Sequence, residues 1–144
     1  MYTLRCTRKL LKRLGAQPSS EAVAPATVLG DWYANLLFTR PQQLVLAMNE
    51  RSLLCVLVPA APGHQLGRRL RDAVSELLLA IGVPAAAVTA EAAAMESMAI
   101  GATSLYLTEN IYSLTGYQTP RLRALELFGV TSGVVRLQRG PWLH

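Results

Sequence analysis

Cys6 has the sequence surroundings of a reactive cysteine. It comes directly before a predicted helix, and Arg5 and Arg8 lie close to it. A helix N-terminus and neighbouring cations both lower the pKa of a thiol, and the thiolate is the nucleophile of cysteine chemistry. No base lies nearby, since His64 is the only internal histidine and no pattern brings it to Cys6, so the alternative is a small apolar core residue. Cys55 lies in an apolar run and is expected in the core.

Three polar residues share one side of the stretch 31–38, namely Asp31, Tyr33 and Asn35. Apolar residues alternate with them, and this alternation predicts a half-buried strand. Polar side chains on one strand face can line a shallow pocket and orient a ligand through hydrogen bonds. The alternative is an ordinary solvated face. The apolar residues predicted on the opposite, buried face are Trp32, Ala34, Leu36 and Phe38.

The basic residues gather on two predicted helices. The formal net charge is +5, and twelve of the fourteen basic residues are arginine, whose planar guanidinium suits phosphate. If both helices pack on one sheet face, their outer sides form a positive strip that binds nucleic acid without sequence preference. No aromatic residue interleaves with these charges, so base stacking is not predicted. The alternatives are two solvated helix faces and a codon bias toward arginine. The strip would contain Arg5, Arg8, Lys9, Lys12, Arg13, Arg68, Arg69 and Arg71.

Metal and cofactor sites are not predicted. The two cysteines and two histidines are scattered, without a CxxC or HxxxH spacing. The sequence also contains no GxGxxG, Walker A or GxSxG pattern. Glu91 and Glu96 are five residues apart, a spacing that separates them around a helix and argues against an acid/base pair.

The elements that must position these residues begin with strands. The apolar runs 31–38, 44–48 and 53–58 are separated by short polar turns, which predicts an antiparallel meander. Residues 2–6 alternate in the same way and predict an N-terminal strand. The last two runs are apolar on both faces, so both faces of the sheet need cover.

Helices complete the predicted fold. Residues 7–14 form an amphipathic helix with Thr7 as its cap, and 64–81 carries an apolar stripe at helical spacing. The Ala-rich segment 83–101 favours another helix, although a strand near 87–91 is also compatible with it. Thr119 and Pro120 can begin a further helix.

We therefore predict one α+β domain over residues 1–144, with a small, mainly antiparallel sheet covered by helices. Residues 16–27 are rich in Pro, Ser and Ala and predict a mobile linker, and 130–144 is expected either to form a loose tail or to add a strand at 134–138. The second apolar face must be covered by the C-terminal half or by another subunit, which makes a homodimer an expectation. No apolar run reaches the length of about 18 residues that spans a bilayer, so we expect a cytoplasmic protein without a membrane partner.

Three phrases carry a family resemblance. They are RCTRKL at 5–10, WYANL at 32–36 and NERS at 49–52. Together they resemble a family of small bacterial proteins that share a domain of unknown function. The resemblance covers roughly the first 60 residues well and the 64–81 helix loosely. It implies a fold grouping and a bacterial setting, and it implies no reaction.

The chain departs from the family at one phrase. Members usually carry Thr-x-Asn-Arg before a Gly-containing helix, whereas residues 108–111 read TENI and place Ile111 where arginine is expected. If the family's function needs that arginine, it is lost or changed in this chain.

Three functions follow from these observations. The first is a non-catalytic interaction or regulatory module of the bacterial cytoplasm, with a protein partner or a second copy. The second is a nucleic-acid-associated protein that uses the arginine strip, in a mobile-element or toxin–antitoxin setting. The third is a small enzyme built on Cys6 or on the face of Asp31, Tyr33 and Asn35.

Overall fold

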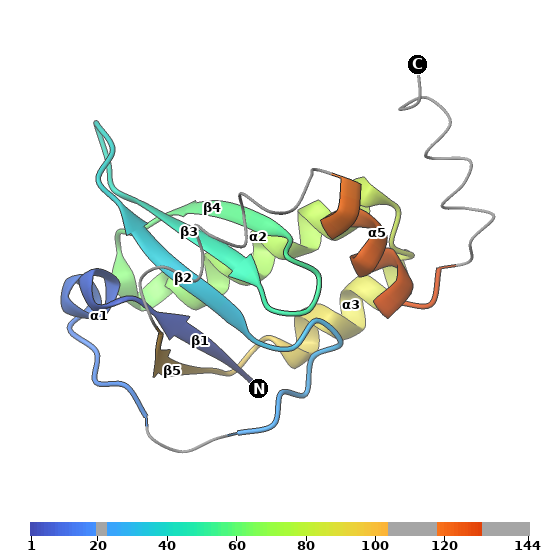
Figure 1. The fold of residues 1–144 in the computed structure, drawn as a ribbon, viewed down its shortest axis with the longest axis horizontal. Helices are drawn as coiled ribbons and strands as arrows, with labels where there is room; N and C mark the ends of the chain where they lie inside the picture. Colours follow the sequence, from blue (N-terminus) through green and yellow to red (C-terminus); the bar gives the residue numbers. More distant parts are fainter. Residues whose placement is uncertain (20–22, 104–117, 131–144) are drawn as a thin grey trace.

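Five strands form one mixed sheet in the computed structural model, which describes residues 1–19, 23–103 and 118–130 (Figure 1). The strand order is β4-β3-β2-β1-β5. The strands are β1 (Tyr2–Cys6), β2 (Trp32–Leu37), β3 (Leu44–Asn49), β4 (Cys55–Pro59) and β5 (Met98–Ala102).

Within the described residues, four α-helices and one 3-10 turn accompany the sheet. They are α1 (Arg8–Leu14), η1 (Gly63–Gln65), α2 (Leu66–Ile81), α3 (Ala85–Ala94) and α5 (Gln118–Leu127). The α+β prediction is therefore confirmed. No helix of the described part is long and apolar enough to cross a bilayer.

The predicted meander is confirmed in β2, β3 and β4. β2 pairs antiparallel with β3 from Trp32 opposite Asn49 to Leu37 opposite Leu44, and β3 pairs antiparallel with β4. The third strand begins at Cys55 and not at Leu53, because Leu53 has φ 67° and belongs to the turn.

β1 and β5 extend the sheet with parallel pairings. β1 lies beside β2, and β5 lies beside β1 on its other side. The helix predicted over 83–101 is wrong at its end, since α3 stops at Ala94 and the chain returns as β5. The two parallel strands approach closely at Gly101. A side chain at this position would place its Cβ 3.0 Å from Thr3 Cγ2, closer than an ordinary contact. Propensity alone could not show this strand, since its hydrogen bonds are made to the far end of the chain.

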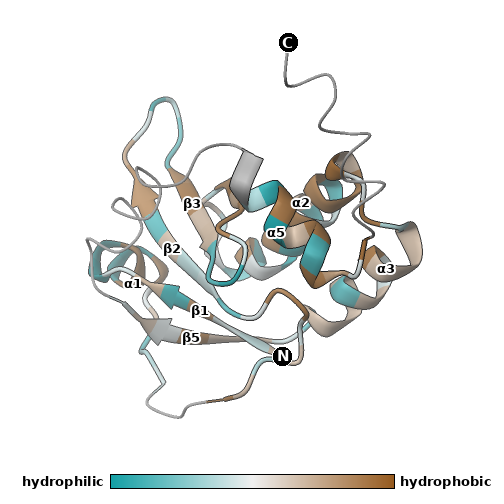
Figure 2. Cartoon of the chain, turned by 45° about the vertical axis from the view of Figure 1, so that its right-hand side comes forward, coloured by the Kyte–Doolittle hydropathy of each residue, from teal (hydrophilic) through white to brown (hydrophobic). Residues whose placement is uncertain are grey.

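One face of the sheet carries the main hydrophobic core. The inward side chains of β1 and β2, including Leu4 and Trp32, are buried together with Leu10 of α1 and the apolar stripe of α2. In Figure 1, α2 runs behind the sheet, and α3 and α5 lie at the right of the view, on the side opposite α1. In Figure 2, the ribbon of α1 alternates between brown and teal, as expected for a helix with one apolar and one charged side.

The other face is less complete. Its apolar side chains come mainly from β3 and β4, where Met48 is buried and Leu46 is half-buried, and β2 adds the half-buried Leu37. Leu57, which is opposite Leu46 in the register, is 56% exposed on the edge strand β4. Asp31, Tyr33 and Asn35 lie on this same face, on the side that the sequence predicts.

The two predicted irregular segments are described in part. In the linker, the Ser19 amide donates to the Ile100 carbonyl at 2.8 Å, and the Ala26 amide donates to the Met1 carbonyl at 2.8 Å. The tail is described only at Val130, which is half-buried against the core. The rest of the tail and the 108–111 phrase lie outside the described residues.

Candidate functional site

Asp31 is buried, and its carboxylate is engaged within the fold. Oδ1 accepts a hydrogen bond from the Thr3 amide at 2.8 Å, and Oδ2 accepts one from the Arg5 guanidinium at 3.1 Å. The backbone amide of Asp31 donates to the Glu50 carboxylate. These bonds join β1 to the start of β2. Because Asp31 is also only 2% exposed, little of its carboxylate is accessible to a ligand.

Asn35 is likewise used internally. Its Oδ1 accepts hydrogen bonds from the Thr7 hydroxyl at 2.8 Å and from the Leu36 amide at 2.9 Å. Thr7 is the N-cap residue of α1, as predicted, but its side chain makes no capping bond because the hydroxyl points to Asn35. Tyr33 is half-buried and, among the described residues, is the member of the predicted polar set with no side-chain hydrogen bond.

Asn49 organises the turn between β3 and β4. Its Nδ2 donates to the carbonyls of Leu29 at 2.8 Å and Asp31 at 3.1 Å. Its Oδ1 accepts from the Ser52 amide at 2.8 Å and from the Ser52 hydroxyl at 2.7 Å. One fully buried amide therefore holds both this turn and the loop that leads into β2.

Glu91 of α3 holds the same loop from the other side. Its two carboxylate oxygens accept from the amides of Val28 at 2.8 Å and Leu29 at 3.0 Å, and the residue is 3% exposed. Sequence reasoning missed this role. The sequence does contain one indication of burial. Glu91 follows Val88 by three residues and precedes Met95 by four, which places it on the buried side of the helix.

Cys6 is enclosed in the core. Its Sγ lies 3.5 Å from the Leu4 carbonyl, and desolvation by burial raises the pKa of the thiol to about 12. This direction is opposite to the one predicted from the neighbouring arginines. Arg5 points to the other face of the sheet, where it bonds Asp31, and Arg8 is exposed. Cys55 is only half-buried, and desolvation raises the pKa of its thiol to about 11.

The raised pKa of Cys6 predicts a loss of stability at alkaline pH. The stabilisation by the buried neutral thiol is fully present below the pKa of the unfolded thiol, near 9.0, and declines as the pH rises toward about 12. At pH 10, one unit above the pKa of the unfolded thiol, ionisation stabilises the unfolded state by about 1.4 kcal/mol and lowers the free energy of unfolding by that amount. In urea unfolding at about pH 8 and about pH 10, the Cys6→Ala variant should lack this part of the decline. Equal declines in both proteins would contradict the assignment, because Tyr2 and Cys55 are present in both.

Two of the three arginines at the start of α2 have partners within the protein. Arg69 is half-buried, and its Nη2 donates to the Pro62 carbonyl at 2.7 Å. Arg71 is half-buried and lies 3.6 Å from the Asp72 carboxylate. Arg68 is exposed. Of the eight residues of the predicted strip, Arg5, Arg69 and Arg71 therefore already have partners within the protein and are less available to bind a phosphate.

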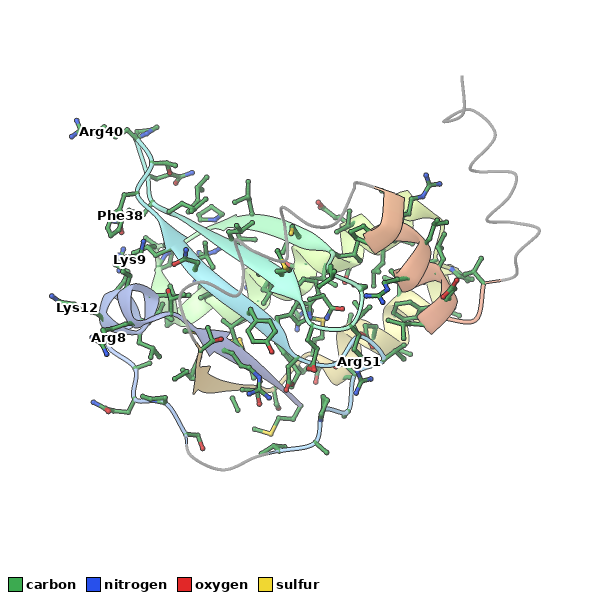
Figure 3. All side chains as sticks on the ribbon, viewed as in Figure 1. Arg8, Lys9, Lys12, Phe38, Arg40 and Arg51 are labelled. Carbon is green, nitrogen blue, oxygen red and sulfur yellow. The ribbon has the colours of Figure 1, made fainter. Side chains whose placement is uncertain are left out.

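The outer side of α1 keeps its charges in solvent. Arg8, Lys9 and Lys12 are exposed, while Arg13 donates from Nε to the Gln43 side chain at 2.9 Å. That bond connects α1 to the hairpin between β2 and β3. Figure 3 shows the three exposed cations beside this hairpin, whereas Arg51 lies at the opposite end of the sheet.

Phe38 is the residue of this region that sequence reasoning misplaced. It was expected on the buried face of β2, but the strand ends at Leu37 and Phe38 is 66% exposed. The ammonium of Lys9 lies 5.3 Å from the centre of its ring, within the range of a cation–π contact. Arg40 is exposed further along the hairpin (Figure 3). An aromatic ring thus does lie among the charges, although Lys9 and Phe38 are far apart in the sequence.

We call Arg8, Lys9, Lys12 and Arg40 the cationic end. None of the four forms an ion pair among the described residues. The sequence contains no Asp or Glu over residues 1–20 or 32–49, which include α1 and the hairpin. The cationic end therefore combines uncompensated positive charge with one exposed aromatic ring, a pattern that suits an anionic partner with planar groups.

A metal-binding cluster is not formed by the described residues. Within residues 1–19, 23–103 and 118–130, no group of three or more His, Cys, Asp or Glu side chains is placed to hold an ion.

Comparison with known proteins yields one family. A model described as a domain of unknown function (DUF6933) matches residues 3–104. The match extends the resemblance seen in the first 60 residues through α3 and β5, and it ends before the 108–111 phrase. No curated protein and no solved structure matches the chain.

Proposed function

We propose that this chain, which belongs to the DUF6933 family, is a non-catalytic binding module whose partner is a nucleic acid held by the cationic end. The observation that carries the proposal is the grouping of Arg8, Lys9, Lys12 and Arg40, which are all exposed and form no ion pair with any described residue. Such a group neutralises successive phosphates and releases their counterions, which supplies affinity without sequence preference.

The non-catalytic part of the proposal is supported by the other candidate residues. The Asp31 carboxylate and the Asn35 carbonyl are buried acceptors of hydrogen bonds within the fold. The Cys6 thiol is buried, and its raised pKa leaves little thiolate near neutral pH. A catalytic group must reach a substrate, and these side chains are turned inward.

The proposal also places the protein in the bacterial cytoplasm and treats it as a homodimer. Leu57, exposed on the edge strand β4, and the half-buried Leu46 beside it supply apolar surface that a second copy would cover. Light scattering of the free protein, at the concentration used for binding, gives its mass. A monomer would remove the homodimer from the proposal and leave the cationic end unaffected.

Binding to a labelled oligonucleotide is expected to weaken steeply with salt. If the four cations each neutralise one phosphate of a single strand, a rise from about 50 to about 200 mM salt should weaken binding about 50-fold. Fluorescence anisotropy measures this dependence. The Arg8→Glu variant should bind about tenfold more weakly, because it loses one phosphate contact and adds repulsion.

Arg123→Glu is the matched control. Arg123 is exposed on α5, at the other end of the molecule from α1, and its substitution changes the net charge equally (Figure 1). The control should bind like the unchanged protein. Equal losses in the two variants would show that only total charge matters, and absence of binding at about 50 mM salt would refute the proposed function.

A further inference from the structure

We propose that Phe38 makes the cationic end selective for single-stranded nucleic acid, by stacking against an unpaired base. This inference rests on the proposed function and adds to it the class of nucleic acid. Four cations alone bind any phosphate backbone, so the selectivity must come from the aromatic ring.

The ring is placed for stacking. β2 ends at Leu37, so Phe38 leaves the sheet and is 66% exposed, the largest exposed fraction among the large hydrophobic residues of the described part. Lys9 lies over the ring with its ammonium 5.3 Å from the centre. With two-thirds of the residue still in solvent, a face of the ring remains open to a planar group. A base can stack there while Lys9 contacts the adjoining phosphate.

The charges around the ring match a strand that passes across it. Arg8 and Lys12 lie on α1 to one side of Phe38, and Arg40 lies further along the hairpin on the other side (Figure 3). A single strand laid along this line brings phosphates to both sides of the ring and a base to the ring itself. A duplex keeps its bases paired and stacked inside, so it presents phosphates to the cations and little to Phe38.

An anionic lipid surface fits the same end less well. Phe38 is followed in the hairpin by Thr39, Arg40, Pro41 and Gln42, which are all exposed and of which none is a large apolar residue. Membrane-surface binding draws its strength from an extended apolar face together with charge. One ring with polar neighbours offers a platform for one base and little area for insertion into a bilayer.

The test compares strands and duplexes with variants of Phe38. The probes are fluorescein-labelled oligothymidylate and oligouridylate of about 20 nucleotides, and a mixed-sequence DNA duplex of the same length. Phe38→Ala should bind the single strands about tenfold more weakly and bind the duplex within about twofold of the unchanged protein. Phe38→Tyr should retain single-strand binding because it keeps the ring, and Phe38→Leu should lose it because it keeps only apolar volume.

Each outcome decides the inference. Equal losses on strand and duplex, or a Phe38→Leu variant that binds like the unchanged protein, would overturn it. So would Phe38-dependent binding to phosphatidylglycerol vesicles with no preference between strand and duplex. Failure of the proposed function looks different, since either no oligonucleotide would bind at about 50 mM salt or neither salt nor Arg8→Glu would weaken the binding.

Discussion

Replacing Asn49 with alanine should lower the free energy of unfolding by about 3–5 kcal/mol. The side chain is fully buried and bonds Leu29, Asp31 and Ser52 at the same time. Alanine leaves two backbone carbonyls, the backbone amides of Arg51 and Ser52 and the Ser52 hydroxyl without these partners, at a fully buried position. Urea unfolding followed by circular dichroism measures the loss.

Gln42→Ala is the control for this prediction. It removes a side-chain amide of similar chemistry from an exposed position in the hairpin, so stability should stay within about 0.5 kcal/mol of the unchanged protein. An Asn49→Ala protein that unfolds at nearly the same urea concentration as the control would show that the buried amide network contributes little.

Replacing Glu91 with glutamine should cost about 2–4 kcal/mol. The substitution keeps the shape of the side chain, but one of the two acceptors for the Val28 and Leu29 amides becomes a donor. Two donors would then face each other at a site that is 3% exposed. The bond to the remaining amide also loses the charge on its acceptor.

Glu96→Gln provides the same chemical change on the surface, just after the end of α3. It should leave the thermal midpoint almost unchanged, whereas Glu91→Gln should lower it by several degrees. If the two variants melt together, the carboxylate of Glu91 does not hold the loop before β2.

The strands and helices that the sequence predicted well are those with a strong local period. The alternation in 31–38 and the apolar stripe in 64–81 were sufficient for β2 and α2. β5 was missed because Ala-rich segments favour a helix, and only the neighbouring β1 makes Met98–Ala102 a strand. Phe38 was misplaced for a related reason. A period gives the face of a strand but not the residue at which the strand ends.

The polar residues of the candidate site were found in the sequence, but their roles were not. Arg5 and Asp31 are 26 residues apart, and Thr7 and Asn35 are 28 apart, so no local pattern reveals that they bond. The three family phrases now have a physical interpretation. They supply the buried hydrogen bonds that join β1 to β2 and that close the turn after β3.

The buried network of Asn49 and Glu91 and the exposed cationic end share no hydrogen bond among the described residues. Asn49 and Glu91 secure the loop before β2, while the cationic end consists of exposed side chains on α1 and the hairpin. Substitutions at sites that are distant and share no partners usually have additive effects on stability. Substitutions in the exposed hairpin should therefore leave the stabilisation by Asn49 and Glu91 unchanged, so that the hairpin surface can vary among relatives while the framework is inherited.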